Sequence, residues 1–509
     1  MAGMKPNCAT ALIASLTEAT PPAMLMACRQ AADQGADMVE LRLDSLEHPI
    51  AAALAQLLSQ PPLPVIATCR PVRQGGFFKG PEEQRLALLR EASRLGANYI
   101  DIEDDVPPGD RPRGQIILSH HDFSGQPRDW QAVMKNLAAQ KPAVVKLAFT
   151  AGTCQDAIEA CRLVRDCPLP AMVLAMGEAG ILSRALARKF GAFGSFASLS
   201  AERASAPGQL TLTQMKQLRW DHIGPATKVY GVAACPVGHS MSPAVHNAAF
   251  DELGLDAVYL PLRVEPSEEA FDGFLDAVLA APWLDMRGLS VTVPHKEHAL
   301  ARVGPAKVDE LSRAIGAINT VRIGRGGELE GFNTDYAAAL ESLCQAMGIE
   351  PAGLADKSVG VLGAGGVARA VVAALAHYQA RITIYNRTPS RAQELAERFG
   401  AQACPAGDIP AMEHEIVINC TSVGMHPRVS ETPAPLEALR RCRVVFDTIY
   451  NPPTTRLLEL ARQAGCTIVG GLEMFVRQAA RQFEIWTDRP APLPVMRQAM
   501  ADRLEANPS

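Results

Sequence analysis

The sequence predicts an α/β protein, in which an N-terminal (β/α)8 TIM barrel precedes a two-domain module with a Rossmann dinucleotide-binding domain. Three observations support this prediction. Eight short β-rich runs alternate with helical segments between residue 8 and about residue 200. A Gly/Pro-containing break, HIGPATK, follows at residues 222–228. Further on, the segment from residue 357 reads as strand, glycine turn, helix and strand.

Length and composition agree with several globular domains. The chain has 509 residues, of which 48% are hydrophobic, so each domain can bury a core of its own. The formal net charge is -5 and no Lys/Arg block occurs, which argues against binding to nucleic acid or to an anionic membrane. No signal peptide and no apolar run of 18 residues is visible, so we expect a cytoplasmic protein.

The 12 cysteines are scattered along the chain and show no Cys-x-x-Cys pair or Cys/His cluster at zinc spacing. The nearest approach to a cluster is Cys154, Cys161 and Cys167, which suits burial as small apolar residues better than metal binding. We therefore expect reduced thiols and no metal site.

The eight expected barrel strands are CATALIASL, ADMVELRLD, LPVIATCR, ANYIDIED, QIILSHHD, PAVVKLAF, AMVLAMGE and FGSFASLS. Segments with apolar residues at helical spacing, such as PEEQRLALLREASRLG, separate them. An open sheet remains an alternative, but eight repeats in about 220 residues favour a closed barrel.

The second half divides into two further domains after the break at 222–228. We expect the barrel at 1–222, a mixed α/β domain at 228–334 that C-terminal helices at 478–509 complete, and a nucleotide-binding domain at 335–477.

Polar residues lie near the carboxyl ends of the barrel strands, where barrel enzymes gather their catalytic side chains. They are Glu40, Arg42, Asp44, Arg70, His120, His121, Asp122, Lys146, Glu178 and Arg184, followed by Ser205 and Gln209 in the loop after the eighth strand. Any one of them could be a salt-bridge partner or a helix cap, but together they predict one shared site.

Lys146 is the most informative of these residues, because Val144, Val145 and Leu147 surround it in a strand. Burial disfavours the charged ammonium and favours a neutral, nucleophilic amine, which can form a Schiff base with a ketone. A nearby histidine could then carry the proton. A structural lysine is the alternative.

Six motifs, VELRLD, TCRPVRQGG, SHHDF, VVKLA, MGEAGILSR and SAPGQ, occur in this order on the expected strands and resemble the type I 3-dehydroquinate dehydratases. The resemblance covers most of residues 8–220. It implies that Lys146 forms the Schiff base and that His121 is the general acid/base. It further implies that Glu40, Arg42 and Arg70 contact ring hydroxyls, and that Arg184, Ser205 and Gln209 bind the carboxylate.

One position departs from the pattern of this family. Gln74 stands where the family usually has a glutamate before the Gly-Gly pair. Glutamine keeps the hydrogen-bonding shape but cannot ionise, so we expect reduced or retuned dehydratase activity.

The segment GAGGVARA predicts a dinucleotide site in the second half, with Gly363, Ala364, Gly365 and Gly366 between a strand and a helix. An NAD site would place an acidic residue about 20 residues further on. The chain has Asn386, Arg387 and Thr388 there, and a cation with a hydroxyl suits a 2'-phosphate, so NADP(H) is favoured.

The segments GHSMSPAVHN, SVTVPHK, GAINT, GFNTD, NCTSVGM, FDTIYNPPTT and GLEMFVRQA resemble the shikimate dehydrogenases across nearly all of residues 229–500. The resemblance implies that Lys296 and Asp335 form the catalytic pair and that Ser240 and Ser242 bind the substrate carboxylate. It also places Thr292, Asn319, Asp335 and Gln478 at ring hydroxyls and Tyr450 at the border of the site. Both serines together favour shikimate over quinate. Without the resemblance, the two serines read equally well as helix caps and Lys296 as a surface lysine.

The two resemblances fit together, because the product of the first reaction, 3-dehydroshikimate, is the substrate of the second. We therefore expect a bifunctional enzyme of aromatic amino acid biosynthesis that binds small molecules, not nucleic acid or membranes. Two alternatives are a metabolite-sensing regulator and a reductase with an impaired barrel. The oligomeric state stays open, with a homodimer as the option that relatives of the barrel favour.

Overall fold

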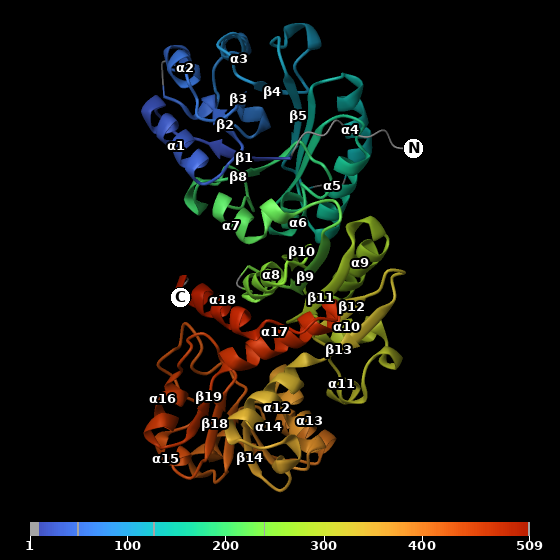
Figure 1. Ribbon diagram of the computed structural model, residues 1–509, viewed down its shortest axis with the longest axis vertical. Coiled ribbons are helices and arrows are strands. Elements are labelled where there is room, and N and C mark those ends of the chain that lie inside the picture. The colour runs from blue at the N-terminus through green and yellow to red at the C-terminus, as the bar shows by residue number, and fades with distance from the viewer. Residues whose placement is uncertain (1–9, 48–49, 126–127, 239, 507–509) are drawn as a thin grey trace. The chain divides into compact units, whose positions relative to one another are not determined.

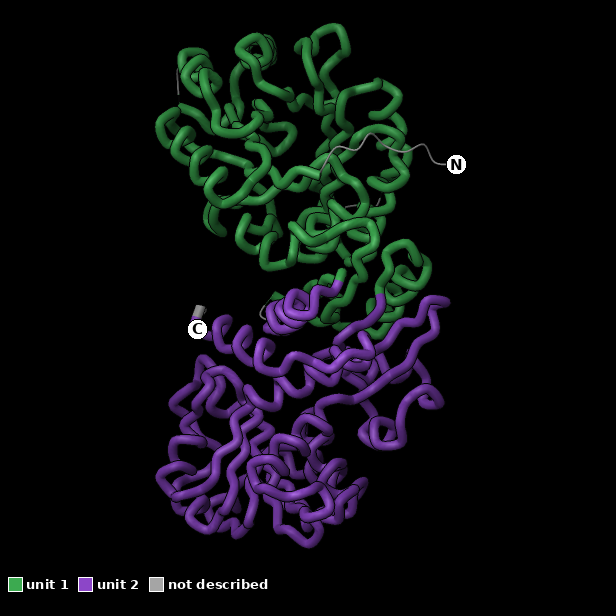
Figure 2. The backbone as a smooth tube through the Cα atoms, viewed as in Figure 1, with its two compact units in different colours: residues 1–239, 256–286 green, residues 240–255, 287–509 purple. Residues whose placement is uncertain are grey.

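The computed structural model describes residues 10–47, 50–125, 128–238 and 240–506 (Figure 1). The expected domain limits at residues 1 and 509 lie outside the described residues. The chain forms two compact units, residues 1–239 with 256–286 and residues 240–255 with 287–509 (Figure 2).

The first unit contains the predicted barrel. Eight parallel strands have the order β7-β6-β5-β4-β3-β2-β1-β8, and the amide of Phe193 donates a 2.8 Å hydrogen bond to the carbonyl of Ala171 where β8 and β7 meet. The strands are β1 (Ala11–Leu16), β2 (Met38–Arg42), β3 (Val65–Thr68), β4 (Tyr99–Glu103), β5 (Ile116–Asp122), β6 (Val144–Thr150), β7 (Ala171–Met176) and β8 (Gly194–Ala197). The helices between them are α1 (Pro21–Asp33), α2 (Ile50–Leu58), α3 (Glu82–Arg94), α4 (Trp130–Ala139), α5 (Cys154–Asp166), α6 (Ile181–Ala185) and α7 (Leu212–Gln217).

The alternation of side chains along β6 decides where its lysine points. Val144 and Ala148 belong to the apolar cluster inside the barrel, and Lys146 lies between them on the same face of the strand. Val145 and Leu147 are buried on the opposite face. The amine of Lys146 therefore lies on the inward face of the barrel, next to the apolar side chains that fill its interior.

The first unit also contains two parallel strands and a helix from the segment expected in the second domain. They are β9 (Lys228–Ala234), β10 (Ala257–Arg263) and α9 (Glu268–Leu279). The guanidinium of Arg219 donates to the carbonyl of Ala257, and Arg263 forms a 3.3 Å ion pair with Glu178 at the end of β7.

Trp283 adds an apolar contact within this unit. Its ring lies edge-on to Phe190, with centroids 5.2 Å apart, and the guanidinium of Arg165 lies 4.4 Å from its centroid. The compact units therefore do not coincide with the limits expected from the Gly/Pro break.

The second unit contains a parallel six-stranded sheet with the order β16-β15-β14-β17-β18-β19. Its strands are β14 (Ser358–Leu362), β15 (Arg381–Asn386), β16 (Gln402–Pro405), β17 (Ile416–Asn419), β18 (Val444–Asp447) and β19 (Thr467–Val469). The order reverses at β14, which creates a crevice at the carboxyl ends of β14 and β17, the usual ligand position in such sheets.

Both faces of this sheet are covered. Ile416 and Ile418 belong to an apolar cluster with α12 (Thr334–Met347), α13 (Gly366–His377) and α14 (Pro389–Phe399). Val417, between them, belongs to a second cluster with α15 (Leu436–Leu439) and α16 (Arg456–Gln463). This alternation explains why the strands read as continuous apolar runs.

The same unit holds an antiparallel set of strands, β11 (Met286–Val291), β12 (Thr320–Ile323) and β13 (Leu329–Phe332). Helices α8 (Ser242–Glu252), α10 (Lys296–Val303), α11 (Glu310–Ile315), α17 (Gly471–Thr487) and α18 (Leu493–Ala506) accompany them. Helix α17 is hydrogen-bonded to β12 and to the residue before it. Gln482 donates to the carbonyl of Asn319, and Trp486 donates to the carbonyl of Val321.

Candidate active sites

One pocket at the carboxyl ends of the barrel strands collects the eight barrel residues that the sequence singles out as site residues. It is lined by Glu40, Arg42, Arg70, His121, Lys146, Arg184, Ser205 and Gln209, with Gln74, Met176 and Phe196 among their neighbours. Side chains from strands far apart in the sequence therefore meet, although their individual roles stay predictions.

Lys146 is buried in this pocket, and it has a carboxylate partner. Its Nζ lies 2.7 Å from Oδ2 of Asp101, 3.7 Å from Oε1 of Glu40 and 4.4 Å from the ring centroid of Phe196. The burial expected from the sequence is present, with 5% of the side chain exposed. Burial is not the only influence on this amine, however, because the Asp101 carboxylate and the face of the Phe196 ring both contact it.

Asp101 and Glu103 on β4 are two residues of the barrel site that were not predicted from the sequence. Asp101 bridges Lys146 and Arg70, since its second oxygen lies 2.8 Å from Nη2 of Arg70, and Ser119 donates to the same oxygen. Glu103 binds the other terminal nitrogen of Arg70 at 2.6 Å. The alternation in YIDIE, which puts two acids on one face of a strand, is the signal that could have found them.

The charges in this network favour ionisation of their partners. Burial alone would raise the pKa of Asp101, but the cations of Arg70 and Lys146 outweigh it and hold this pKa well below its usual range. Burial would likewise lower the pKa of Arg70, while Asp101 and Glu103 raise it above its ordinary value. Both groups are charged at neutral pH.

The surroundings of His121, in contrast, favour its uncharged form. Burial, followed by the nearby cations of Arg70 and Lys146, holds its pKa well below the ordinary value. Its Nδ1 is buried and has no hydrogen-bond partner among the described residues. A neutral imidazole beside the amine can accept a proton. The neighbouring His120 instead contacts Asp104 at 2.9 Å.

Arg184 on α6 is a buried cation with no ion-pair partner in the part of the chain that the structure describes. Burial lowers its pKa to about 10. A desolvated guanidinium without a carboxylate suits a ligand that brings one. Ser205 lies at the same pocket, and its amide and hydroxyl both donate to Oε1 of Gln209.

Glu40 and Arg42 on β2 are engaged within the protein. Glu40 accepts hydrogen bonds from Ser15 at 2.6 Å and Thr68 at 2.9 Å. Arg42 forms a bidentate pair with Asp44, at 3.0 and 2.7 Å, while still lining the pocket. The predicted contacts of Glu40 and Arg42 to ring hydroxyls must therefore use side-chain atoms, or acceptor positions on them, that these hydrogen bonds do not occupy.

Gln74 lines the same pocket from the loop after β3. Its Oε1 is buried and accepts no hydrogen bond from the described residues. The position that departs from the family pattern thus presents a neutral acceptor to the site.

A second polar cluster lies in the second unit, at the start of α12. Lys296 Nζ lies 2.6 Å from Oδ2 of Asp335, and Asn319 donates to Oδ1 of Asp335 at 2.9 Å. The side chain of Asn333 accepts from the amide of Asp335 and so fixes the first turn of the helix. The lysine and the carboxylate are 20% and 12% exposed, so a substrate can reach them.

The other predicted residues of this site have fewer contacts. Ser240 accepts a 3.3 Å hydrogen bond from the amide of Ser242 at the start of α8. Thr292 directly follows β11, and Tyr450 follows β18 and packs on a neighbouring phenylalanine with ring centroids 5.2 Å apart. Burial raises the pKa of Tyr450.

Gln478 lies on α17 one turn before a glutamine that sequence reasoning missed. Gln482 accepts from Ser290 and donates to Asn319 and Thr320. Residues four apart lie on one face of a helix, so Gln478 shares the face that carries Gln482.

The glycine turn after β14 has the geometry that a dinucleotide needs. Gly363 has φ +107°, and a Cβ there would come within 3.1 Å of the carbonyl oxygen of Cys420. At Gly365 and Gly366 a Cβ would meet nothing within 4 Å, and no side chain caps the start of α13. The start of this helix therefore leaves room beside its first glycines and has no side-chain cap, which suits the binding of a phosphate.

The end of β15 carries the predicted 2'-phosphate contacts. Asn386 donates to the carbonyl of Thr388 at 2.9 Å, and Arg387 is exposed between them. Arg391, in the first turn of α14, is exposed as well and was not singled out from the sequence.

No helix among the described residues is long and apolar enough to cross a membrane. Within the same residues, no group of three or more His, Cys, Asp or Glu side chains could hold a metal ion.

Models of four protein families match the chain. They are type I 3-dehydroquinase at residues 12–224, the shikimate dehydrogenase substrate binding domain at 232–321, shikimate / quinate 5-dehydrogenase at 346–448 and the shikimate 5'-dehydrogenase C-terminal domain at 471–501.

Individual proteins are similar over the whole chain or its second half. The bifunctional 3-dehydroquinate dehydratase/shikimate dehydrogenase, chloroplastic, of Arabidopsis thaliana is 37% identical over 94% of this chain and 82% of its own length. The shikimate dehydrogenase (NADP(+)) of Methanosarcina acetivorans is 41% identical over 55% of this chain and 99% of its own. The crystal structure of a Thermus thermophilus shikimate 5-dehydrogenase in complex with NADP(H) and shikimate is 35% identical over 54% of this chain and 99% of that one, with a TM-score of 0.48.

Proposed function

The chain belongs to the family of bifunctional 3-dehydroquinate dehydratase/shikimate dehydrogenases, and from this premise we propose how its residues divide the two reactions. The barrel dehydrates 3-dehydroquinate to 3-dehydroshikimate, and the second activity reduces 3-dehydroshikimate to shikimate with NADPH. The observation that carries the assignment of residues is the barrel pocket, where a buried amine, a neutral imidazole and an uncompensated guanidinium line one cavity.

Lys146 attacks the C3 ketone of 3-dehydroquinate after its ammonium has lost one proton, and water leaves as the imine forms. The protonated imine withdraws electrons and acidifies the C2–H bond. His121 takes the C2 proton, the C1–O bond breaks, and the same proton leaves with the hydroxyl group as water. Hydrolysis of the imine then releases 3-dehydroshikimate and regenerates Lys146.

Arg184 binds the substrate carboxylate, with Ser205 and Gln209 beside it. A planar guanidinium fork matches a planar carboxylate, and the ligand supplies the counter-charge that the buried cation lacks. Glu40, Arg42 and Arg70 orient the ring hydroxyls.

In the second unit, Lys296 polarises the C3 ketone of 3-dehydroshikimate and provides a proton to its oxygen, while Asp335 holds Lys296 in place. Thr292, Asn319, Asp335 and Gln478 hold the ring hydroxyls, Ser240 and Ser242 bind the carboxylate, and Tyr450 borders the site. The two serines favour shikimate over quinate, which has one more hydroxyl beside the carboxylate.

The reductase uses NADP(H), which supplies the hydride when bound. Gly363, Ala364, Gly365 and Gly366 hold the pyrophosphate at the start of α13, and Asn386, Arg387 and Thr388 hold the 2'-phosphate. Arg391 adds a second cation close to this position.

A coupled assay with 3-dehydroquinate and NADPH tests the two activities together, because only the full chain of reactions yields shikimate without a second enzyme. An impaired barrel would reduce added 3-dehydroshikimate but not convert 3-dehydroquinate, and a metabolite-binding regulator would do neither.

Trapping with borohydride tests the chemistry of the barrel. In the presence of 3-dehydroquinate we expect a mass adduct on the peptide that contains Lys146, and no adduct in the Lys146→Ala variant. An unmodified Lys146 in an active wild-type enzyme would overturn the imine mechanism.

We further propose the domain limits 1–222, 228–334 completed by 478–509, and 335–477, which limited proteolysis tests. A cytoplasmic location is consistent with the eleven described cysteines, all of which are free thiols. Cell fractionation tests the location, and light scattering after size exclusion tests the expected homodimer.

A further inference from the structure

Arg85 on α3 is a fully buried arginine that does not line the barrel pocket. Its Nη1 donates to the carbonyl of Cys69 at 2.9 Å and forms a 2.7 Å ion pair with Oε2 of Glu103. Its Nη2 lies 2.6 Å from Glu82, which is 42% exposed. Both partners of its Nη1 lie in or next to strands that build the pocket.

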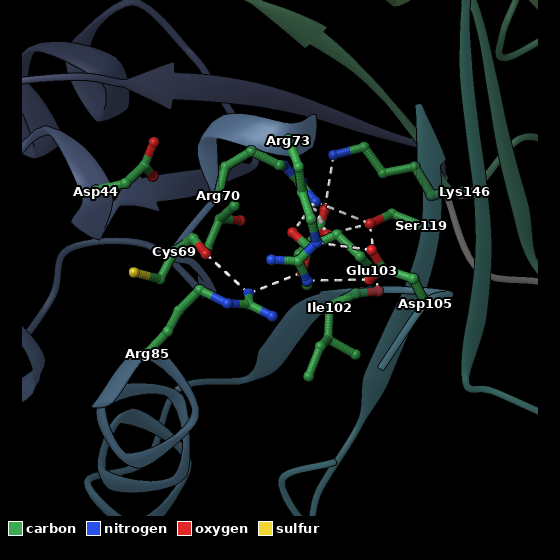
Figure 3. A network of polar contacts seen from close by, with 12 residues as sticks. Asp44, Cys69, Arg70, Arg73, Arg85, Ile102, Glu103, Asp105, Ser119 and Lys146 are labelled. Atoms are coloured by element: carbon green, nitrogen blue, oxygen red, sulfur yellow. Dashed lines mark hydrogen bonds and ion pairs between the residues drawn. The ribbon is translucent and has the colours of Figure 1, made fainter. Parts of the chain in front are cut away.

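Glu103 connects Arg85 to the residues of the pocket. Its other oxygen lies 2.6 Å from Arg70, and Arg70 lies 2.8 Å from Asp101, which in turn holds Lys146 at 2.7 Å. Figure 3 shows Arg85, Glu103, Arg70 and Lys146, with Arg85 on the side remote from Lys146. A continuous run of ion pairs thus connects α3 to the amine.

The buried charges in this run sum to zero. Arg85, Arg70 and Lys146 carry three positive charges, and Glu103, Asp101 and Glu40 carry three negative ones, with at most 5% of each side chain exposed. An unbalanced charge costs much more in such a place than at the surface.

We propose that Arg85 is a positioning residue of the dehydratase, which through Glu103 fixes Arg70 at the pocket and keeps the charge of this run of ion pairs balanced. The inference rests on the role of Lys146 given under Proposed function.

Loss of the Arg85 charge leaves one negative charge in excess within the run of ion pairs from α3 to Lys146. That charge favours the protonated form of His121, which cannot take the C2 proton. The ascending limb of the dehydratase pH profile therefore moves to higher pH, by about half a unit or more. The groups that face Lys146 are otherwise unchanged: Glu40 from β2, Arg70 after β3, Asp101 from β4, His121 from β5, Arg184 from α6 and the Phe196 ring from β8.

The experiment compares pH profiles of dehydratase kcat/KM in the full-length enzyme. Arg85→Gln is expected to lower kcat/KM at pH 7 by about 10-fold to 100-fold and to shift the limb upward. Glu103→Gln alone shifts it downward, and the double variant returns it toward the wild-type position because both charges are removed. Arg85→Lys retains most activity. Arg94→Gln, which removes an exposed ion pair on the same helix, is the matched control and changes neither activity.

Two further measurements distinguish failure of the Arg85 proposal from failure of its premise. The reductase activity reports whether each variant is folded, and borohydride trapping reports whether Lys146 forms the imine. A wild-type enzyme that forms the adduct while Arg85→Gln keeps the wild-type profile refutes the role of Arg85 alone. No adduct on the wild type refutes the premise instead. If Arg85→Gln does not fold, the difference between Glu103→Gln, whose limb moves downward, and the double variant, whose limb returns toward the wild-type position, decides, and equal profiles for these two would overturn the proposal.

Discussion

Replacing Arg184 by methionine should stabilise the protein while it disables the dehydratase. Burial lowers the pKa of Arg184 from 12.5 to about 10. Each pKa unit corresponds to about 1.4 kcal/mol, so the charge costs the ligand-free fold on the order of 3 kcal/mol. The lowered pKa fixes the sign: the cost is present throughout the pH range below about 10, where the group is charged in both the folded and the unfolded chain. Methionine keeps an apolar stem and removes the charge, so the free energy of unfolding should rise by about 1–3 kcal/mol.

The same substitution removes the carboxylate fork. Two charge-assisted hydrogen bonds at about 1.5–3 kcal/mol each predict a fall in dehydratase kcat/KM of about 10²-fold to 10⁴-fold. Calorimetry and a dehydratase assay measure the two effects, the reductase activity reports on the intact second unit, and Arg184→Lys keeps the charge without the fork. A variant that is less stable than the wild type and dehydrates 3-dehydroquinate at an unchanged kcat/KM would refute the reasoning.

Four further predictions concern the imidazole of His121, the amine of Lys296 and a pair of arginines. His121→Gln should lower dehydratase kcat by about 10²-fold to 10⁴-fold while the borohydride adduct on Lys146 still forms, and loss of the adduct would instead place the histidine in imine formation. Because the pKa of His121 lies well below its ordinary value, NMR titration of the free enzyme should find this imidazole neutral at pH 6.5, and a protonated ring there would contradict the burial argument. Lys296→Ala should lower reductase kcat by about 10²-fold or more and leave the dehydratase intact. Removing Arg387 and Arg391 together should raise KM for NADPH by about 10-fold to 100-fold and leave that for NADH unchanged, whereas equal effects on both cofactors would exclude a 2'-phosphate contact.

The strands and the location of the barrel site could be predicted from the sequence, because both follow from local periodicity. The alternation of β6 fixes the inward direction of Lys146, and the rule that catalytic groups sit at strand carboxyl ends fixes its neighbours. The glycine turn at Gly363 is equally local, since its positive φ is a property of a few consecutive residues.

The partners of these residues could not be predicted, because they arise only when the barrel closes. Asp101 is 45 residues from Lys146 along the chain and becomes its ion-pair partner from β4, which only β5 separates from β6. Arg85 reads as one of several charged residues on an amphipathic helix, and nothing local shows that it is buried. Gln482 was missed for the same reason, since its partners lie on β11 and β12, more than 160 residues away in sequence.

The association of residues 256–286 with the barrel has a practical consequence for anyone who wishes to produce the dehydratase alone. A gene cut at the Gly/Pro break would leave Phe190 without the indole of Trp283 and Glu178 without Arg263. Such a fragment would lose both the aromatic contact and the ion pair. The two catalytic activities can be assigned to separate stretches of sequence, but a cut at residues 222–228 would separate residues 256–286 from the compact unit to which they belong.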